Sequence, residues 1–121
     1  MNDPAYEPLT EAAALSEVRF VHDYMQFVFW PYGLSIYAKV SVSTKGQVLF
    51  PNDAGYFDSI CNLIGQKLVA VTRTEGVELE FKFSGGTCLL VSLRLEEAVG
   101  PEVAMLSHED GGHLMVERYG E

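Results

Sequence analysis

The stretch that decides the fold is VELEFKFSGGTCLLVSL, Val77 to Leu93. Its first half alternates valine, leucine and phenylalanine with glutamate and lysine, which is typical of a strand with one face on a core and one in water. A three-residue loop, 84–86, reverses the chain and opposes Phe81 with Leu89. A two-residue loop would oppose Lys82 with Leu89, so the apolar faces argue against it. The stretch therefore predicts an antiparallel hairpin.

A third strand precedes this hairpin in the segment KLVAVTRTEG. A three-residue loop, 74–76, ends in glycine and opposes Val69 with Phe81 and Val71 with Leu79. The segment therefore extends the hairpin to a three-stranded antiparallel meander.

The last strand of the meander is apolar on both faces, because Leu90 and Cys88 lie on the face that carries Glu80 next door. Either this face is exposed or something covers it. A second chain, or strands from the N-terminal half, would provide that cover. One hypothesis is therefore a homo-oligomer formed through the Leu90 face.

The N-terminal half predicts a second hairpin. Residues 18–30 are rich in β-branched and aromatic side chains, and Leu34 to Val42 alternate strictly between apolar and other residues. A four-residue loop, 30–33, opposes Phe29 with Leu34 and makes one face wholly apolar. A three-residue loop would break that face, so an even-numbered loop is favoured.

Residues 53–64 are predicted to form the central helix of the domain. Phe57, Ile60, Cys61 and Ile64 recur at helical spacing, a capping signal at Asn52-Asp53 precedes them, and Gly65 follows. The final segment predicts one more hairpin, with apolar runs at 103–106 and 114–116.

A chain of 121 residues has the size of one ordinary domain. Residues 1–16 contain two prolines and a short run of helix formers, and we expect them to form a loosely attached arm. Residues 17–121 then form a single α+β domain. We expect about six to seven antiparallel strands, with the central helix packed on the sheet.

The charge of the chain restricts its partners. Seventeen acidic residues against eight basic ones give a formal net charge of −9, which repels phosphate backbones and anionic membranes. We therefore expect neither nucleic acid nor a membrane as a partner. No apolar run of about 18 residues is present, and the N-terminal sequence lacks the basic start and apolar stretch of a signal peptide. These features predict a cytoplasmic protein.

The string HEDGGH, 108–113, superficially resembles a zinc motif. Its histidines are five apart with two glycines between them, so a turn is favoured over a helix. A two- or four-residue loop would place His108 opposite His113, where the pair could share a metal. Zinc needs at least a third protein ligand, for which His22 and Asp23 are only distant candidates. The alternative hypothesis is therefore a protein that binds a small molecule or a metal through these histidines.

No catalytic constellation emerges from the sequence. Cys61 lies on the apolar face of the predicted helix and Cys88 in an apolar strand, so both are expected to be buried free thiols. We expect no cofactor, and an enzyme is the less favoured class.

Two other groups are candidates for contact with a protein. Glu78 and Glu80 share the water-facing side of one strand, where they could form an acidic docking patch. Trp30 and Tyr32 lie at a predicted hairpin tip, and exposed tryptophan and tyrosine are favoured interface anchors.

The combined pattern of DYMQFVF, LSIYAKVSV, YFDSICNLIGQKLVAV, LEFKFSGGTCLLVSL and GPE, within residues 20–103, resembles a family of small uncharacterised bacterial α+β proteins. Some of these are similar to immunity proteins encoded beside toxins. The resemblance rests on core and turn positions and implies no catalytic residues. It implies a non-enzymatic protein-binding module, with a basic toxin as the partner that it would neutralise.

Overall fold

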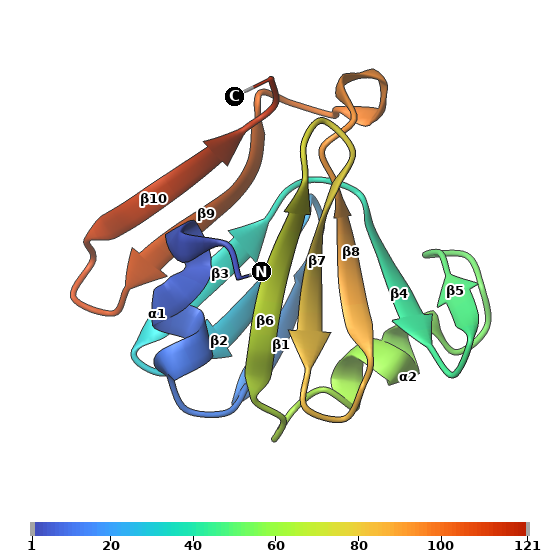
Figure 1. Cartoon of the computed structure of the whole chain (residues 1–121), viewed down its shortest axis with the longest axis horizontal. Helices are drawn as coiled ribbons and strands as arrows, with labels where there is room; N and C mark the ends of the chain where they lie inside the picture. Colours follow the sequence, from blue (N-terminus) through green and yellow to red (C-terminus); the bar gives the residue numbers. More distant parts are fainter. Residues whose placement is uncertain (1, 121) are drawn as a thin grey trace.

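Two five-stranded antiparallel sheets make up the computed structural model, which describes residues 2–120 (Figure 1). Their strand orders are β1-β2-β3-β9-β10 and β5-β4-β8-β7-β6, and the apolar side chains of both sheets share one core. The strands are β1 (Glu17–Val21), β2 (Tyr24–Phe29), β3 (Tyr32–Ile36), β4 (Val40–Thr44), β5 (Gln47–Leu49), β6 (Leu68–Thr74), β7 (Glu78–Phe83), β8 (Cys88–Ser92), β9 (Glu102–His108) and β10 (His113–Arg118). The helices are α1 (Glu7–Glu11) and α2 (Tyr56–Cys61), with 3-10 turns at Pro4–Tyr6 and Leu95–Glu97.

The antiparallel architecture is confirmed, but the described chain is richer in strands than expected. It has ten strands rather than six to seven. One cause is that residues 18–30 form two strands, since the chain turns back at His22-Asp23 and pairs Val21 with Tyr24. Another is that Leu34 to Val42 contribute a strand to each sheet.

The crossing from β3 to β4 joins the two sheets. The apolar residues of the strict alternation are all buried: Leu34, Ile36, Ala38, Val40 and Val42. The alternation continues across the break because both sheets turn these residues toward the same core. Sequence pattern alone therefore does not reveal where one sheet ends and the other begins.

In the β2–β3 and β7–β8 hairpins, the predicted registers place the side chains on the correct faces of the sheet. Some of the predicted cross-strand pairs are nevertheless wrong. Phe29 lies opposite Tyr32 rather than Leu34, because the β2–β3 loop contains two residues instead of four. An even-numbered change leaves every side chain on the same face. In the meander the pairing of Phe81 with Leu89 is confirmed.

The pairing of β6 with β7 differs from the prediction. Val71 lies opposite Phe81 rather than Leu79, and the register shifts between Leu68 and Ala70. This irregularity turns Val69 to solvent with 52% of its surface exposed. An extra residue in one strand changes the face of the sheet on which the neighbouring side chains lie. The alternation in the sequence does not reveal such a residue.

The helix is shorter than the predicted 53–64 and turns a different face inward. Within α2, Tyr56 and Ile60 are buried, whereas Phe57 and Cys61 are exposed. The helix begins after Gly55, whose positive φ of 87° redirects the chain and changes which side faces the core. The prediction that Cys61 is buried is therefore wrong, although both cysteines are free.

The predicted loose attachment of residues 1–16 is also wrong. Tyr6, Leu9 and Leu15 are almost completely buried. In Figure 1, α1 lies between β10, the outer strand of the first sheet, and β6, the outer strand of the second. The N-terminal segment therefore closes one side of the core and belongs to the folded unit.

A cluster of polar side chains, here called the clasp, fixes this segment to both sheets. Arg73 of β6 donates from Nη1 and Nη2 to the two carboxylate oxygens of Glu117 on β10, at 3.0 and 2.7 Å. Its Nε donates to Asp3 at 2.7 Å, and the Tyr6 hydroxyl donates to Glu117 at 3.0 Å. The hydrogen bonds to Glu117 raise the pKa of Arg73, and burial raises the pKa of Tyr6. The clasp therefore favours a charged guanidinium and a neutral phenol.

We expect the stability of the fold to fall at alkaline pH. Tyr56 donates its hydroxyl to the Val40 carbonyl at 2.8 Å, and burial raises the pKa of Tyr56 to about 12. Because the folded state favours the neutral phenol, this stability is present below about pH 10, the unfolded value, and is lost as the pH rises through 12. Denaturant titrations at pH 8 to 12 should show the loss, and Tyr56→Phe should reduce its steepness. An unchanged slope in this variant would contradict the assignment.

Within residues 2–120, no helix has the length and apolar character needed to cross a membrane.

Candidate functional site

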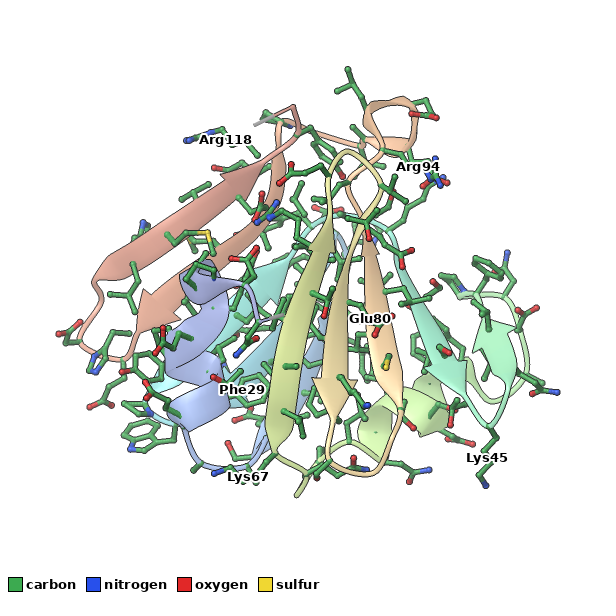
Figure 2. All side chains as sticks on the ribbon, viewed as in Figure 1. Phe29, Lys45, Lys67, Glu80, Arg94 and Arg118 are labelled. Atoms are coloured by element: carbon green, nitrogen blue, oxygen red, sulfur yellow. The ribbon has the colours of Figure 1, made fainter. Side chains whose placement is uncertain are left out.

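The outer face of the second sheet holds a mixed row of polar and apolar side chains. Glu80 of β7 lies opposite Leu90 of β8, and Leu90 lies opposite Ser41 of β4. One row further along, Glu78 lies opposite Ser92. Figure 2 shows Glu80 on the side of the second sheet that faces away from the first. Leu90 is therefore an apolar side chain surrounded by polar ones on a face turned away from the core.

A groove of about 550 Å³ runs over this face. Leu90 and Ser41 belong to its floor, and the segments on either side of the sheet form its walls. Its lining consists of Lys39, Val40, Ser41, Val48, Phe50, Pro51, Asn52, Val77, Glu78, Leu90, Ser92, Arg94 and Glu97. A volume of this size accommodates several side chains of a partner. We call this feature the outer groove.

One wall of the outer groove comes from β5 and the turn that follows it. Lys45 and Gly46 both have positive φ, as a tight hairpin turn requires, and they bring β5 back along β4. The Asp53 carboxylate accepts the Phe50 N–H at 2.8 Å and fixes the turn beyond the strand. Val48 and Phe50 nevertheless remain 46% and 57% exposed. The wall thus presents two apolar side chains to solvent.

The opposite wall comes from the end of β8 and the 3-10 turn Leu95–Glu97. The Ser92 hydroxyl donates to the Glu97 carboxylate at 2.5 Å and accepts the Arg94 N–H at 3.2 Å. These bonds fix the direction in which the chain leaves the strand. Figure 2 shows Arg94 at this end of the second sheet.

The outer groove is balanced in charge. Its carboxylates are Glu78 and Glu97, and its cations are Lys39 and Arg94. Glu80 in the next row pairs with Leu90, and Lys82 follows on the same face. The two glutamates singled out from the sequence therefore lie beside an apolar strip with basic groups close by.

The thiol of Cys88 shares this face but is not arranged as a nucleophile. Burial, followed by the nearby Glu80 carboxylate, raises the pKa of Cys88 above its ordinary value. Both effects favour the protonated thiol, whereas nucleophilic cysteines are activated by a lowered pKa.

Trp30 and Tyr32 lie on the first sheet and not beside Glu78 and Glu80. Trp30 is 58% exposed at the tip of the β2–β3 hairpin. Tyr32 lies opposite His108, with the two rings edge to face and 5.4 Å between their centroids. The predicted contact residues therefore belong to two separate surfaces, one on each sheet.

The two histidines do not face each other as predicted. His113 lies opposite Ser107, and the His108 N–H donates to the Gly112 carbonyl at 2.8 Å. The loop 108–112 has an odd number of residues, so His108 and His113 point to opposite faces of the hairpin. The sequence did not reveal the added residue, because two- and four-residue loops both satisfied the glycine pattern.

Local hydrogen bonds already use the groups around His108. Its Nδ1 accepts the Asp110 N–H at 3.2 Å, and the Gly112 N–H bond lowers the pKa of the Asp110 carboxyl. Among residues 2–120, no three or more His, Cys, Asp or Glu side chains form a group suited to holding a metal ion.

The apolar wall of the outer groove was missed in the sequence. Its signal was the pair Lys45-Gly46 between VSVST and QVLF, which is typical of a tight hairpin. The proximity of Val48 and Phe50 to Leu90 depends on the pairing of β4 with β8, which strand pattern alone does not specify.

Comparison with known proteins finds no matching family model, no similar curated protein and no similar solved structure.

Proposed function

We propose that the protein is a non-enzymatic binding module that takes an extended segment of a basic protein partner into the outer groove. An apolar side chain of the partner would pack on Leu90, Val48 and Phe50. Basic side chains flanking that anchor would pair with Glu78 and Glu80. The resemblance to immunity proteins suggests a toxin as the partner, and neutralisation would then occur by occlusion.

The observation that carries this proposal is the apolar strip on an otherwise polar sheet face. Leu90 is only partly buried, and Phe50 is 57% exposed across the groove from it. Covering such a strip recovers free energy in proportion to the apolar area removed from water, about 25 cal/mol per Å². A side chain anchored in a groove and surrounded by polar contacts is the usual arrangement of an interface hot spot.

The sign of the partner's charge follows from the whole chain. The lining of the groove is balanced, but the chain carries a net charge of −9. A field of this sign attracts basic partners over a distance, and its effect decreases as salt screens it. We therefore expect association to slow as the salt concentration rises.

Binding can be tested with short synthetic peptides that carry one leucine flanked by lysines. NMR titration of the ¹⁵N-labelled protein should shift the amides of residues that line the outer groove. A peptide with glutamates in place of the lysines, or serine in place of the leucine, should bind at least about tenfold more weakly. Absence of binding by the lysine–leucine peptide, or shifts confined to other surfaces, would contradict the proposal.

Two variants with similar exposure provide a matched comparison. Phe50→Asp should weaken binding of the lysine–leucine peptide by about tenfold or more, because it places a charge in the apolar strip. Leu114→Asp, on the outer strand of the first sheet, should leave the affinity within about twofold. Thermal unfolding of both variants establishes that each remains folded. An equal loss of peptide affinity in the two variants would show that the peptide does not bind in the outer groove.

A further inference from the structure

Strand β1 is an outer strand of the first sheet, and it pairs with β2 through five consecutive residues without a bulge. No other strand of the described chain pairs with its outer side. Alternate N–H and C=O groups of such a strand point outward and can pair with another strand.

The outer strand of the second sheet, β6, differs from β1, because backbone groups on its outer side already form hydrogen bonds within the chain. The Asp3 N–H donates to the Val71 carbonyl at 2.7 Å, and the Val71 N–H donates to the Asn2 side chain at 2.7 Å. The N-terminal segment therefore occupies both backbone bonding groups of Val71, in the middle of β6, and obstructs the pairing of another chain there.

Apolar side chains are exposed along β1 and beside it. Phe20 is 43% exposed, and its ring meets that of Phe57 edge to face at a centroid distance of 5.1 Å. Both rings line a groove of about 420 Å³, to which Val21 and Met25 also contribute. An apolar surface beside an open strand is a favourable place for another chain to pack.

The charges on β1 are complementary to those of a second copy. If two β1 strands pair antiparallel about Val18, Glu17 lies opposite the partner's Arg19, and the reciprocal pair forms by symmetry. Phe20 then lies opposite the partner's Ser16, which is small enough to leave the contact between Phe20 and Phe57 in place. Pairing about Arg19 would instead oppose two arginines.

We propose that a second copy of the chain pairs with the first along β1, about Val18. The first sheet of one copy and the first sheet of the other then form one continuous antiparallel sheet. The contact is two-fold symmetric, with backbone hydrogen bonds at its centre and the Glu17–Arg19 pairs on either side. Its centre lies on β1 of the first sheet, whereas the outer groove lies over the second sheet; the groove beside β1 and the outer groove adjoin at Lys39, Val40 and Pro51.

Complementary charge reversals test the register. Glu17→Arg leaves two arginines on β1, and Arg19→Glu leaves two glutamates, so each variant alone should dimerise about tenfold more weakly. Mixing the variants places every arginine opposite a glutamate and should restore a heterodimer, measured by sedimentation equilibrium and native mass spectrometry. The Arg19–Glu17 bond within one chain is absent from both variants and is not restored by mixing. Recovery would therefore report contact between chains.

Three outcomes would overturn the proposal. One is a wild-type protein that stays monomeric up to about 1 mM, since its dissociation constant would then lie above that concentration. Another is a mixture that contains no more heterodimer than either variant forms homodimer. The third is loss of the dimer in Leu114→Asp, because Leu114 lies on β10, the opposite outer strand of the first sheet. If the wild-type protein is monomeric but still binds the lysine–leucine peptide, the proposed binding function stands and the β1 dimer does not.

Discussion

Replacing Arg73 with methionine is expected to lower the free energy of unfolding by about 3–5 kcal/mol. Methionine occupies a similar volume but cannot donate to Glu117 or Asp3, which are both largely buried. Each carboxylate would then be held away from water without its guanidinium partner. Denaturant titration near neutral pH measures the loss.

Two further variants separate the clasp from general effects of the substitution. Arg118→Met removes an exposed pair with Glu102 and should change stability by no more than about 1 kcal/mol. Arg73→Met combined with Glu117→Met removes both partners of the bidentate pair and should recover part of the loss. A single Arg73→Met variant as stable as Arg118→Met would show that the clasp contributes little.

Replacing Phe29 with alanine is expected to cost about 3–5 kcal/mol. Phe29 of the first sheet stacks on Phe83 of the second, with 6.1 Å between the ring centroids and an angle of 20° between the rings. Both side chains are buried, so the variant removes a contact between the sheets and leaves a cavity. The free energy of unfolding again gives the measurement.

The exposed Phe50 provides the matched control for this prediction. Phe50→Ala makes the same chemical change at a position 57% exposed, and should cost about 1 kcal/mol or less. Similar losses in the two variants would indicate that Phe29 does not connect the sheets as described.

The sequence predicted local pairing well because alternation reports directly on burial. The pairing of Phe81 with Leu89 followed from alternation and one glycine-rich loop, and the two residues do lie opposite each other in the structure. The inward face of Leu34 to Val42 was also right. Strand side chains were assigned to the wrong face where one residue more or less changes the parity, at the β6 irregularity and between the paired Ser107 and His113.

Long-range structure was not predictable from these patterns. Arg73 and Glu117 are 44 residues apart, and Tyr6 and Glu117 are 111 apart. Nothing in the short segments around them indicates that they meet. The same holds for the outer groove, where Glu78 was found from its strand but Phe50 required the arrangement of β4, β5 and β8. Trp30 and Glu80 were grouped by residue type, whereas the fold places them on different sheets.

The clasp also determines when the fold can be completed during synthesis. Asp3 and Tyr6 are made before Glu117, which lies 111 residues beyond Tyr6 in the sequence. The bonds of Glu117 to Arg73 and Tyr6 therefore cannot form until β10 has left the ribosome. Until then the side of the core covered by α1 lacks its closing strand. The segment around Tyr6 consequently waits for β10, made much later, before its polar contacts are complete.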